Sequence, residues 1–243
     1  MNPILLIPAR MASARLPGKP LADIAGRPMI VRVWERAMAA KLGPVVVAAG
    51  EPEIVACIAA AGGRAVLTDP ALPSGSDRIF AALQSLDPER RHDVIVNLQG
   101  DLPALESETI RAVVDALSGA DIATLAAEIT DPAERDNPAV VKAVVAWDGG
   151  GKKGRALYFT RTRAPSGEGP LFHHIGIYAF TRSALARFVA LPPSPLEKRE
   201  KLEQLRALEA NMRIAVARVD RVPLSVDTPA DLERANRILK NSP

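Results

Sequence analysis

Residues 4–20, ILLIPARMASARLPGKP, contain the stretch that decides the fold. The apolar run Ile4–Ile7 is closed by Pro8 and is too short for a helix, so it predicts a buried parallel strand. The loop behind it carries three permanent cations: Arg10, Arg15 and Lys19. Open α/β sheets bind ligands beyond the carboxyl ends of their strands, so this loop is a candidate binding loop.

The composition of the loop suits a triphosphate. An arginine offers two parallel hydrogen bonds to a phosphate, and a lysine offers a mobile point charge. Small residues such as Ala9 and Ser13 allow the backbone to approach a ligand closely. The chain has neither GxxxxGK[ST] nor GxGxxG, so cations rather than glycine amides have to hold the phosphate charge. The alternative interpretation is a solvated surface loop.

Length and composition narrow the class of protein. With 243 residues the chain is long enough for one large α/β domain, and we predict a single domain over 1–243. A net charge of +3 and 4% aromatic residues argue against a nucleic-acid partner. The apolar runs are too short to span a membrane and the first one is interrupted by Pro8, so we expect a cytoplasmic protein.

Apolar strands and helices alternate along the first half of the chain. This alternation predicts a doubly wound, Rossmann-like and mostly parallel sheet with flanking helices. The expected strands are 4–7, 45–49, 64–67 and 93–98, and the expected helices are 28–41, 51–61 and 106–117. Further strands are expected at 121–128, 156–159 and 172–180. The run SPLEKREKLEQLRALE predicts a helix with Ser194 as N-cap and Glu197, three residues later, completing a capping box.

The segment LPSGSDR, residues 72–78, predicts the start of another helix. Ser76 and Asp77 are expected to cap it, and Ser74-Gly75 supplies a flexible entry. Arg78 is unfavourable in the first turn because the helix dipole is positive there, so it is a candidate ligand contact. A surface arginine is the alternative.

Two aspartates follow expected strands. Asp101 ends the triplet Gln99-Gly100-Asp101 beyond the strand 93–98, where it is placed to hold Mg²⁺ on phosphates. Asp227 precedes Thr228, which is the expected N-cap of a helix beginning with Pro229. For both aspartates the alternative role is a carboxylate that caps a turn or a helix.

The chain resembles the 3-deoxy-manno-octulosonate cytidylyltransferases (CMP-Kdo synthetases), a family of sugar nucleotidyltransferases with a GT-A-like fold. PAR-x-x-S-x-RLPGKPL matches the amino-terminal signature of that family. Further matches follow in the same order along nearly the whole chain: SGSDR at 74–78, QGD at 99–101, HIGIY at 174–178, PSPLE with LEQLR at 193–206, and SVDTP at 225–229. This agreement is more specific than any single motif.

The resemblance implies the reaction CTP plus 3-deoxy-manno-octulosonate giving CMP-Kdo plus pyrophosphate, which supplies lipopolysaccharide biosynthesis. It implies Mg²⁺ held by Asp101 and Asp227, with Gln99 reading the cytosine edge. Arg10, Arg15 and Lys19 complete the implied catalytic set. The implied nucleotide-binding residues are Ala9, Arg10, Ser13, Arg15, Lys19, Ser74, Gly75, Arg78, Gln99 and Gly100. The implied sugar-binding residues are Arg161, His174, Tyr178, Glu203 and Gln204.

The resemblance also implies an internal organisation. Residues 1–130 form a nucleotide-binding part, 131–215 a sugar-binding and dimerisation part, and 216–243 a return to the core. A homodimer is expected to form through the strands around 139–180. The chain departs from the family at Leu102, where an acidic residue is common, and in a short loop after Arg161.

Three other functions stay open. The substrate could be another acidic sugar, such as a neuraminate or 8-amino-Kdo. A glycosyltransferase that uses a sugar nucleotide shares this type of sheet, but QGDLP lacks the second carboxylate of its usual DxD motif. A catalytically silent nucleotide-binding protein is the third, and the presence of all three cations and both aspartates argues against it.

Overall fold

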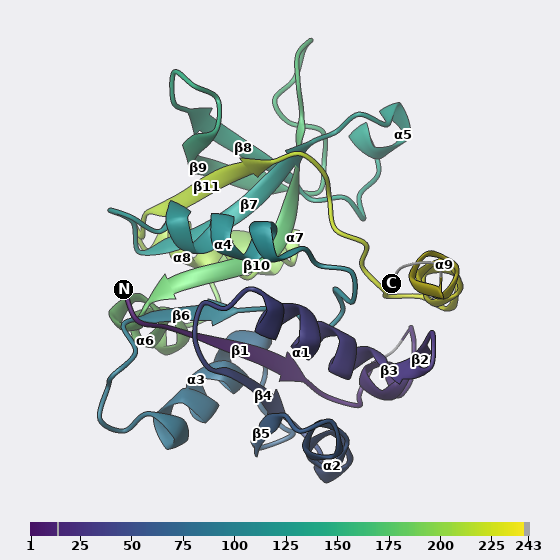
Figure 1. The fold of residues 1–243 in the computed structure, drawn as a ribbon. Helices are drawn as coiled ribbons and strands as arrows, with labels where there is room; N and C mark the ends of the chain where they lie inside the picture. The colour runs from purple at the N-terminus through teal and green to yellow at the C-terminus, as the bar shows by residue number, and fades with distance from the viewer. Residues whose placement is uncertain (14, 241–243) are drawn as a thin grey trace. The chain divides into compact units, whose positions relative to one another are not determined.

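The computed structural model describes residues 1–13 and 15–240, and the chain divides into two compact units (Figure 1). The first unit contains residues 1–111 and the chain from Pro223 onward. The second unit contains Ala112–Val222. The predicted α/β class is confirmed. The chain leaves the first unit after Arg111, earlier than the expected end of the nucleotide-binding part near residue 130.

A parallel sheet forms the centre of the first unit. Its strands are β1 (Pro3–Ala9), β4 (Val45–Ala49), β5 (Arg64–Leu67) and β6 (Val94–Asn97), in the order β5-β4-β1-β6. All three pairings are parallel. The predicted strand at 4–7 is therefore a central strand of this unit, and its leucine and isoleucine side chains are buried on both faces. Because the strands run in one direction, the loops after β1, β4 and β6 open at the same edge.

Helices pack against this sheet as the sequence predicts. They are α1 (Met29–Ala39), α2 (Pro52–Ala60) and α3 (Gly75–Leu86), while α4 (Ser107–Ala116) contains the boundary at Arg111. The predicted cap of α3 is wrong by two residues. The N-cap is Ser74, whose hydroxyl accepts a hydrogen bond from the Asp77 amide, so Ser76 and Asp77 lie inside the first turn.

The last helix, α9 (Pro229–Lys240), belongs to the first unit. Figure 1 shows it beside the short hairpin of β2 (Asp23–Ile24) and β3 (Arg27–Pro28), which follows the 3-10 turn η1 (Lys19–Leu21). Val226, Ala235 and Leu239 share a buried cluster with Ile24 and Met29. This cluster fixes the position of the segment that carries Asp227.

The second unit is built mainly from antiparallel strands. They are β7 (Ile122–Glu128), β8 (Lys142–Trp147), β9 (Lys153–Thr160), β10 (Phe172–Thr181) and β11 (Ile214–Val219). Only β7 and β11 pair in parallel within this unit, and β8 pairs with both β9 and β10, so the five strands close into a ring. The expected mostly parallel arrangement therefore describes the first unit and not the second.

Four helices complete the second unit: α5 (Pro132–Arg135), α6 (Arg182–Ala190), α7 (Pro195–Glu200) and α8 (Leu205–Glu209). The predicted capping box of Ser194 and Glu197 is confirmed. The single helix expected after it is wrong, because Lys201 adopts a left-handed φ of 57° and ends α7. Across the part of the chain that the structure describes, no helix has both the length and the apolar character needed to cross a membrane.

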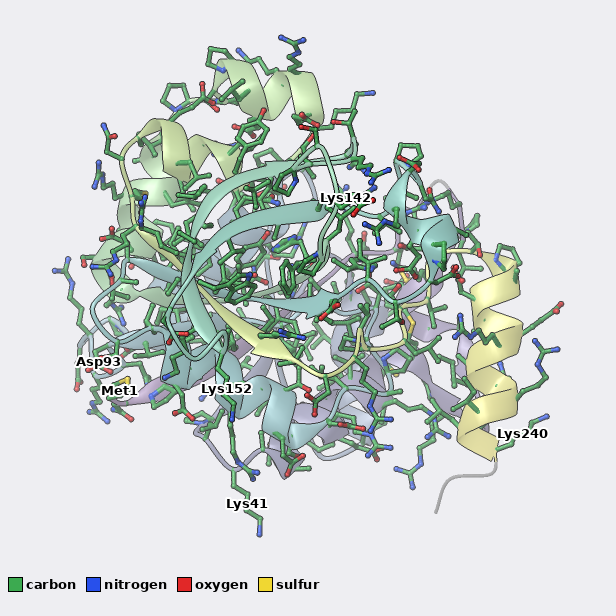
Figure 2. All side chains as sticks on the ribbon, turned by 90° about the horizontal axis from the view of Figure 1, so that it is seen from above. Met1, Lys41, Asp93, Lys142, Lys152 and Lys240 are labelled. Carbon is green, nitrogen blue, oxygen red and sulfur yellow. The ribbon has the colours of Figure 1, made fainter. Side chains whose placement is uncertain are left out.

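Lys142 is a buried cation of the second unit. Lys41, Lys152 and Lys240 project outward from their elements in Figure 2, whereas Lys142 lies among the strands with no exposed surface. Its ammonium group donates to the main-chain oxygens of Asn137 at 2.7 Å, Val140 at 2.8 Å and Arg161 at 3.2 Å. Burial lowers the pKa of Lys142, and the three carbonyls satisfy its three protons.

Candidate active site

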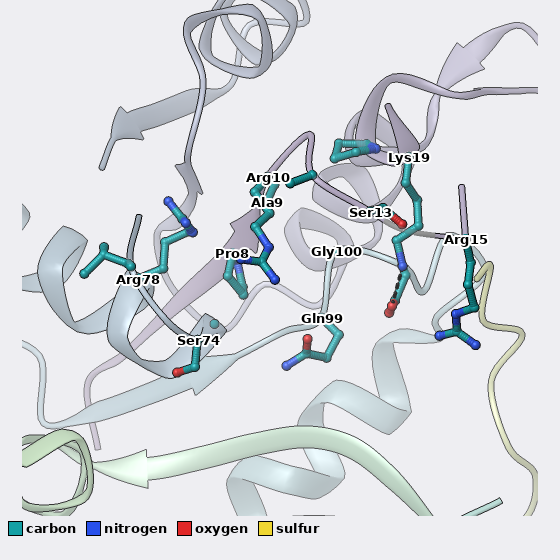
Figure 3. A pocket seen from close by; sticks show the side chains of 15 residues that line it. Pro8, Ala9, Arg10, Ser13, Arg15, Lys19, Ser74, Arg78, Gln99 and Gly100 are labelled. Atoms are coloured by element: carbon teal, nitrogen blue, oxygen red, sulfur yellow. Dashed lines mark hydrogen bonds and ion pairs between the residues drawn. The ribbon is translucent and has the colours of Figure 1, made fainter. Parts of the chain in front are cut away.

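A cavity of about 380 Å³ opens in the first unit where β1 and β6 end (Figure 3). All ten residues predicted to bind the nucleotide line it, and Asp101 lies among them. Four lining residues were not predicted: Pro8, Ala12, Pro20 and Leu72. Each of them adjoins or lies within a quoted motif, so the motifs marked the right segments although they did not single out these side chains.

Two features shape the cationic loop, a hydrogen bond to Glu51 and the left-handed turn at Gly18. The amide of Met11 donates to the Glu51 carboxylate at 2.9 Å, which anchors the start of the loop beside α2. Gly18 adopts a left-handed φ of 67°, which glycine tolerates, and turns the chain into η1 so that Lys19 returns to the cavity. In Figure 3, Lys19 and Arg15 lie on one side of the cavity and Ser74 on the other.

The QGD loop lies close to the end of β1. A β-carbon on Gly100 would lie 3.0 Å from the carbonyl oxygen of Pro8, so glycine permits this approach. The Gln99 side chain extends into the cavity in Figure 3, and its amide nitrogen donates to Asn97 Oδ1 at 3.4 Å. The amide of Gln99 therefore keeps an oxygen with which it can contact a base edge.

Asp101 and Asp227 meet at one ammonium group. Lys19 Nζ lies 2.9 Å from Asp101 Oδ2 and 3.1 Å from Asp227 Oδ1. Arg15 Nη2 lies 3.2 Å from the same oxygen of Asp227. A main-chain hydrogen bond of 3.0 Å from the Val226 amide to the Asp101 carbonyl joins the two segments. The pair of carboxylates predicted from distant parts of the sequence is thus assembled within one unit.

The pKa of Lys19 responds to the two neighbouring carboxylates. Burial alone lowers the pKa of the ammonium group, but the neighbouring carboxylates of Asp101 and Asp227 outweigh burial, so the pKa of Lys19 is raised above its ordinary value. The ammonium group therefore stays charged. Lys19 and Arg15 together neutralise the two carboxylates.

The cap of α9 holds Asp227 in place. The carboxylate of Asp231 accepts hydrogen bonds from the amide of Asp227 at 3.2 Å and the amide of Thr228 at 2.9 Å. The hydroxyl of Thr228 accepts from the Asp231 amide at 3.2 Å, so the predicted N-cap is confirmed. Asp231 was not predicted as a supporting residue, although its position three residues after the cap was the available signal.

The donor set fits a magnesium ion. Mg²⁺ takes oxygen ligands and is commonly held by one or two carboxylates together with substrate phosphates. The carboxylates of Asp101 and Asp227 both lie within hydrogen-bond distance of Lys19 Nζ, and both side chains are partly exposed. Among residues 1–13 and 15–240, no cluster of three or more His, Cys, Asp or Glu side chains could hold a metal by itself. The remaining ligands would have to come from substrate and water.

Arg78 lines the cavity, but its guanidinium group is already engaged. It donates to Thr68 Oγ1 at 2.6 Å, to the Asp69 carbonyl at 3.1 Å and to the Pro70 carbonyl at 3.3 Å. Burial, with the nearby charge of Arg10, lowers the pKa of Arg78. Arg78 therefore fixes the segment after β5 that borders the cavity, a role that the sequence interpretation missed. Direct contact with a ligand stays a prediction.

The five predicted sugar-binding residues lie in the second unit. His174 and Tyr178 are neighbours on β10, with ring centroids 5.6 Å apart. Burial and the nearby His173 lower the pKa of His174 to about 3, so this imidazole is neutral at physiological pH. Its Nε2 atom lies 2.9 Å from the Thr124 hydroxyl. Burial raises the pKa of Tyr178, which keeps its hydroxyl protonated.

Of the remaining predicted sugar contacts, Arg161 already binds main-chain acceptors. The Arg161 guanidinium donates to the carbonyls of Glu200 at 2.8 Å, Pro138 at 3.1 Å and Lys201 at 3.3 Å. Glu203 and Gln204 lie in the break between α7 and α8, where Gln204 is buried. A carboxylate ligand of Arg161 would therefore compete with main-chain acceptors.

The family model described as "Cytidylyltransferase" matches residues 4–214. The chain therefore belongs to the cytidylyltransferase family, and its first unit carries the cavity described above. Within that family it belongs to the 3-deoxy-manno-octulosonate cytidylyltransferases. A relative with that name from Parvibaculum lavamentivorans is 66% identical, over 98% of this chain and 93% of its own. One from Rhodospirillum centenum is 64% identical over the same shares of the two chains.

Solved structures agree with this assignment. A CMP:2-keto-3-deoxy-manno-octonic acid synthetase complexed with CTP matches with a TM-score of 0.91 and 35% identity, covering 98% of each chain. A 4-diphosphocytidyl-2C-methyl-D-erythritol synthase from Anaerococcus prevotii has a TM-score of 0.65 at 14% identity, which shows a shared fold only. The family resemblance predicted from the quoted motifs is confirmed.

Proposed function

We propose that this protein transfers the cytidylyl group of CTP to 3-deoxy-manno-octulosonate, releasing pyrophosphate and forming CMP-Kdo. The observation that carries the proposal is the cavity of the first unit, which three loop cations line and where Lys19 and Arg15 pair with the carboxylates of Asp101 and Asp227. Relatives that are 60–66% identical over nearly the whole chain bear the name of this activity. The product serves lipopolysaccharide biosynthesis in this proposal, and the expected location is the cytoplasm.

The residues of the first unit account for nucleotide binding. Arg10, Arg15 and Lys19 offset the negative charge of the triphosphate and of the leaving pyrophosphate. The amino-terminal end of α3 at Ser74-Gly75 lines the same cavity and favours an anion because its amides and helix dipole are positive there. Gln99 is placed to contact the cytosine edge.

The bond changes are those of an in-line displacement. The anomeric hydroxyl oxygen of the sugar forms a bond to the α-phosphorus of CTP, and the bond between that phosphorus and the bridging oxygen to the β-phosphate breaks. The hydroxyl loses its proton to water, and pyrophosphate leaves with the bonding electron pair. Such transfers depend mainly on positioning and on stabilisation of charge.

Magnesium is the proposed cofactor, held by Asp101 and Asp227. When bound, the metal supplies Lewis-acid polarisation of the phosphate and lowers the pKa of the attacking hydroxyl. Asp101 and Asp227 would hold the ion, and Arg10, Arg15 and Lys19 would hold the phosphates.

The sugar is proposed to bind to the second unit through Arg161, His174, Tyr178, Glu203 and Gln204. The low pKa of His174 supports a role as a neutral hydrogen-bonding contact rather than as a general base. A homodimer formed through the strands around 139–180 completes the proposal, and sedimentation equilibrium of the full chain tests it.

The decisive experiment supplies purified protein with CTP, Mg²⁺ and one candidate sugar acid at a time, and measures pyrophosphate. We expect release with 3-deoxy-manno-octulosonate. A higher kcat/KM with a neuraminate or with 8-amino-Kdo would reassign the substrate. No release with any of the acids, together with measurable CTP binding, would support the silent nucleotide-binding protein instead.

A further inference from the structure

Lys19 occupies the place where a cation is needed between the two carboxylates. Its Nζ atom lies within hydrogen-bond distance of an oxygen of each, Asp101 Oδ2 and Asp227 Oδ1. Its side chain is only 17% exposed, so the ammonium group is largely withdrawn from solvent. A divalent ion that used these same oxygens would have to displace it.

We propose that Lys19 acts as an internal counter-cation of the carboxylate pair. While it pairs with both aspartates, free divalent metal binds there weakly, and when a polyphosphate binds, Lys19 moves to the phosphates and releases the two carboxylates for the metal. This inference rests on the proposed metal site and deepens it, because it states when that site can be filled. It concerns the order of binding, which the family assignment does not address.

The charges at the site support this exchange. Asp101 and Asp227 carry two negative charges, and Lys19 and Arg15 supply two positive charges that touch them. A metal ion added to this balanced set brings a like charge close to the ammonium group, which weakens its binding. A polyphosphate brings new anionic oxygens, to which the flexible lysine side chain can transfer. The two oxygens are then free for the metal.

The geometry of the loop permits that transfer. Lys19 begins the short turn η1 directly after Gly18, and its side chain reaches the carboxylates from the same loop that carries Arg10 and Arg15. All three cations line one cavity, so a polyphosphate bound by the arginines lies within the cavity that Lys19 also lines. Binding of polyphosphate and binding of metal should therefore strengthen each other, and by linkage the effect is reciprocal.

The test measures Mn²⁺ binding to the full chain without nucleotide, by the electron paramagnetic resonance signal of the free ion. We expect Lys19→Met to bind Mn²⁺ about tenfold more tightly than the unaltered protein, within the usual range of coupling between two sites. Lys19→Arg keeps the charge and should bind as weakly as the unaltered protein. Arg10→Met is the matched control, because it removes a cavity cation that makes no ion pair with Asp101 or Asp227 within the described residues.

A second measurement uses inorganic tripolyphosphate, which carries no cytosine and is not a substrate of the proposed reaction. Relative to the Mn²⁺ that tripolyphosphate binds in the absence of protein, it should tighten Mn²⁺ binding to the unaltered protein and have a smaller effect on Lys19→Met. Equal Mn²⁺ affinities of Lys19→Met and Arg10→Met, or equal tripolyphosphate effects with and without Lys19, would overturn the inference. Loss of cytidylyl transfer with every sugar acid, together with the expected Mn²⁺ results, would refute the proposed function and leave the inference standing.

Discussion

At the scale of single residues, Asp227 is the carboxylate that pairs with two cations of the cavity lining. It receives Lys19 and Arg15 on one oxygen, while its own amide is fixed by Asp231. Its side chain is 36% exposed, so its charge does not carry the fold. Its contribution is a negative charge placed beside Lys19 and Arg15.

We expect Asp227→Asn to fold normally and to release almost no pyrophosphate. The amide keeps the size of the side chain but removes the charge that pairs with Lys19 and that, in the proposed function, holds the metal. Steady-state pyrophosphate release and thermal unfolding of the same preparation measure the two effects. Glu233→Gln, which removes an exposed carboxylate from α9, is the matched control. Near-normal turnover of Asp227→Asn would contradict the metal assignment.

Arg15 tests the phosphate role of the loop. Its side chain is 65% exposed, so its removal should leave the stability of the protein almost unchanged. We expect Arg15→Ala to lower kcat/KM for CTP by on the order of 10²-fold, by analogy with loss of one donor to a developing negative charge. The KM for the sugar acid should change much less. Equal losses for both substrates would show that the loop does not hold the triphosphate.

At the scale of elements, the N-terminus of α9 links helix formation to the site. Asp231 does not line the cavity, but its carboxylate binds the amides of Asp227 and Thr228. We expect Asp231→Ala to lower the free energy of unfolding by about 1 kcal/mol, the usual cost of a lost cap. It should also weaken Mn²⁺ binding in the presence of tripolyphosphate, because Asp227 loses its anchor.

Ser194 provides the control for this prediction. It caps α7 through a capping box of its own with Glu197, within the second unit. Ser194→Ala should cost a similar amount of stability and leave metal binding in the first unit unchanged. If both variants weaken metal binding equally, the effect follows from stability and not from the position of Asp227.

The elements themselves were largely predictable because local rules decide them. The run Ile4–Ile7 and the strand 45–49 are apolar on both faces, and Pro229 after Thr228 marks a helix start. The break at Lys201 was not predictable, because a left-handed lysine carries no local signal and the surrounding pattern is helical. At this break the Arg161 guanidinium donates to the main-chain oxygens of Glu200 and Lys201, a tertiary contact that the local pattern does not contain.

At the scale of the whole molecule, buried imidazoles tie stability to pH. His174 has a folded pKa of about 3 against an ordinary value of 6.5, and the pKa of His173 is also lowered by burial. Between about pH 3 and pH 6.5, His174 binds a proton in the unfolded chain but not in the folded chain. The free energy of unfolding should therefore be fully retained above pH 6.5 and fall as the pH drops below it.

We expect a slope approaching about 1.4 kcal/mol per pH unit for each such histidine. Urea unfolding at pH 7.5, 6.0 and 5.0 measures it. The pKa values of Glu197 and Asp231 are lowered in the folded protein. The stability that these carboxylates contribute is therefore lost only when the pH falls through the ordinary range of carboxyl groups, which lies below the range in which the histidines act. His174→Gln should reduce the slope between pH 6.5 and 5. An unchanged slope would show that His174 does not resist protonation.

The lining of the cavity was largely predictable, but the contacts of its side chains were not. The motifs identified most of the residues that line the cavity, because residue types and their order along the chain can be read from the sequence. They did not show that Arg78 and Arg161 donate to main-chain carbonyls, since a sequence gives a donor without its acceptor. For the same reason, the sequence did not predict that Lys19 contacts both aspartates or that Lys142 is buried against main-chain carbonyls.

The first unit takes residues from both sides of the second one in the sequence. On a ribosome, the strand that leads into the cationic loop emerges early, and Asp227 emerges only after all of Ala112–Val222 has been made. The residues that line the cavity are therefore all synthesised long before Asp227, the second carboxylate of the pair. Catalytic competence would switch on in one late step of translation, when the segment before α9 docks beside Asp101.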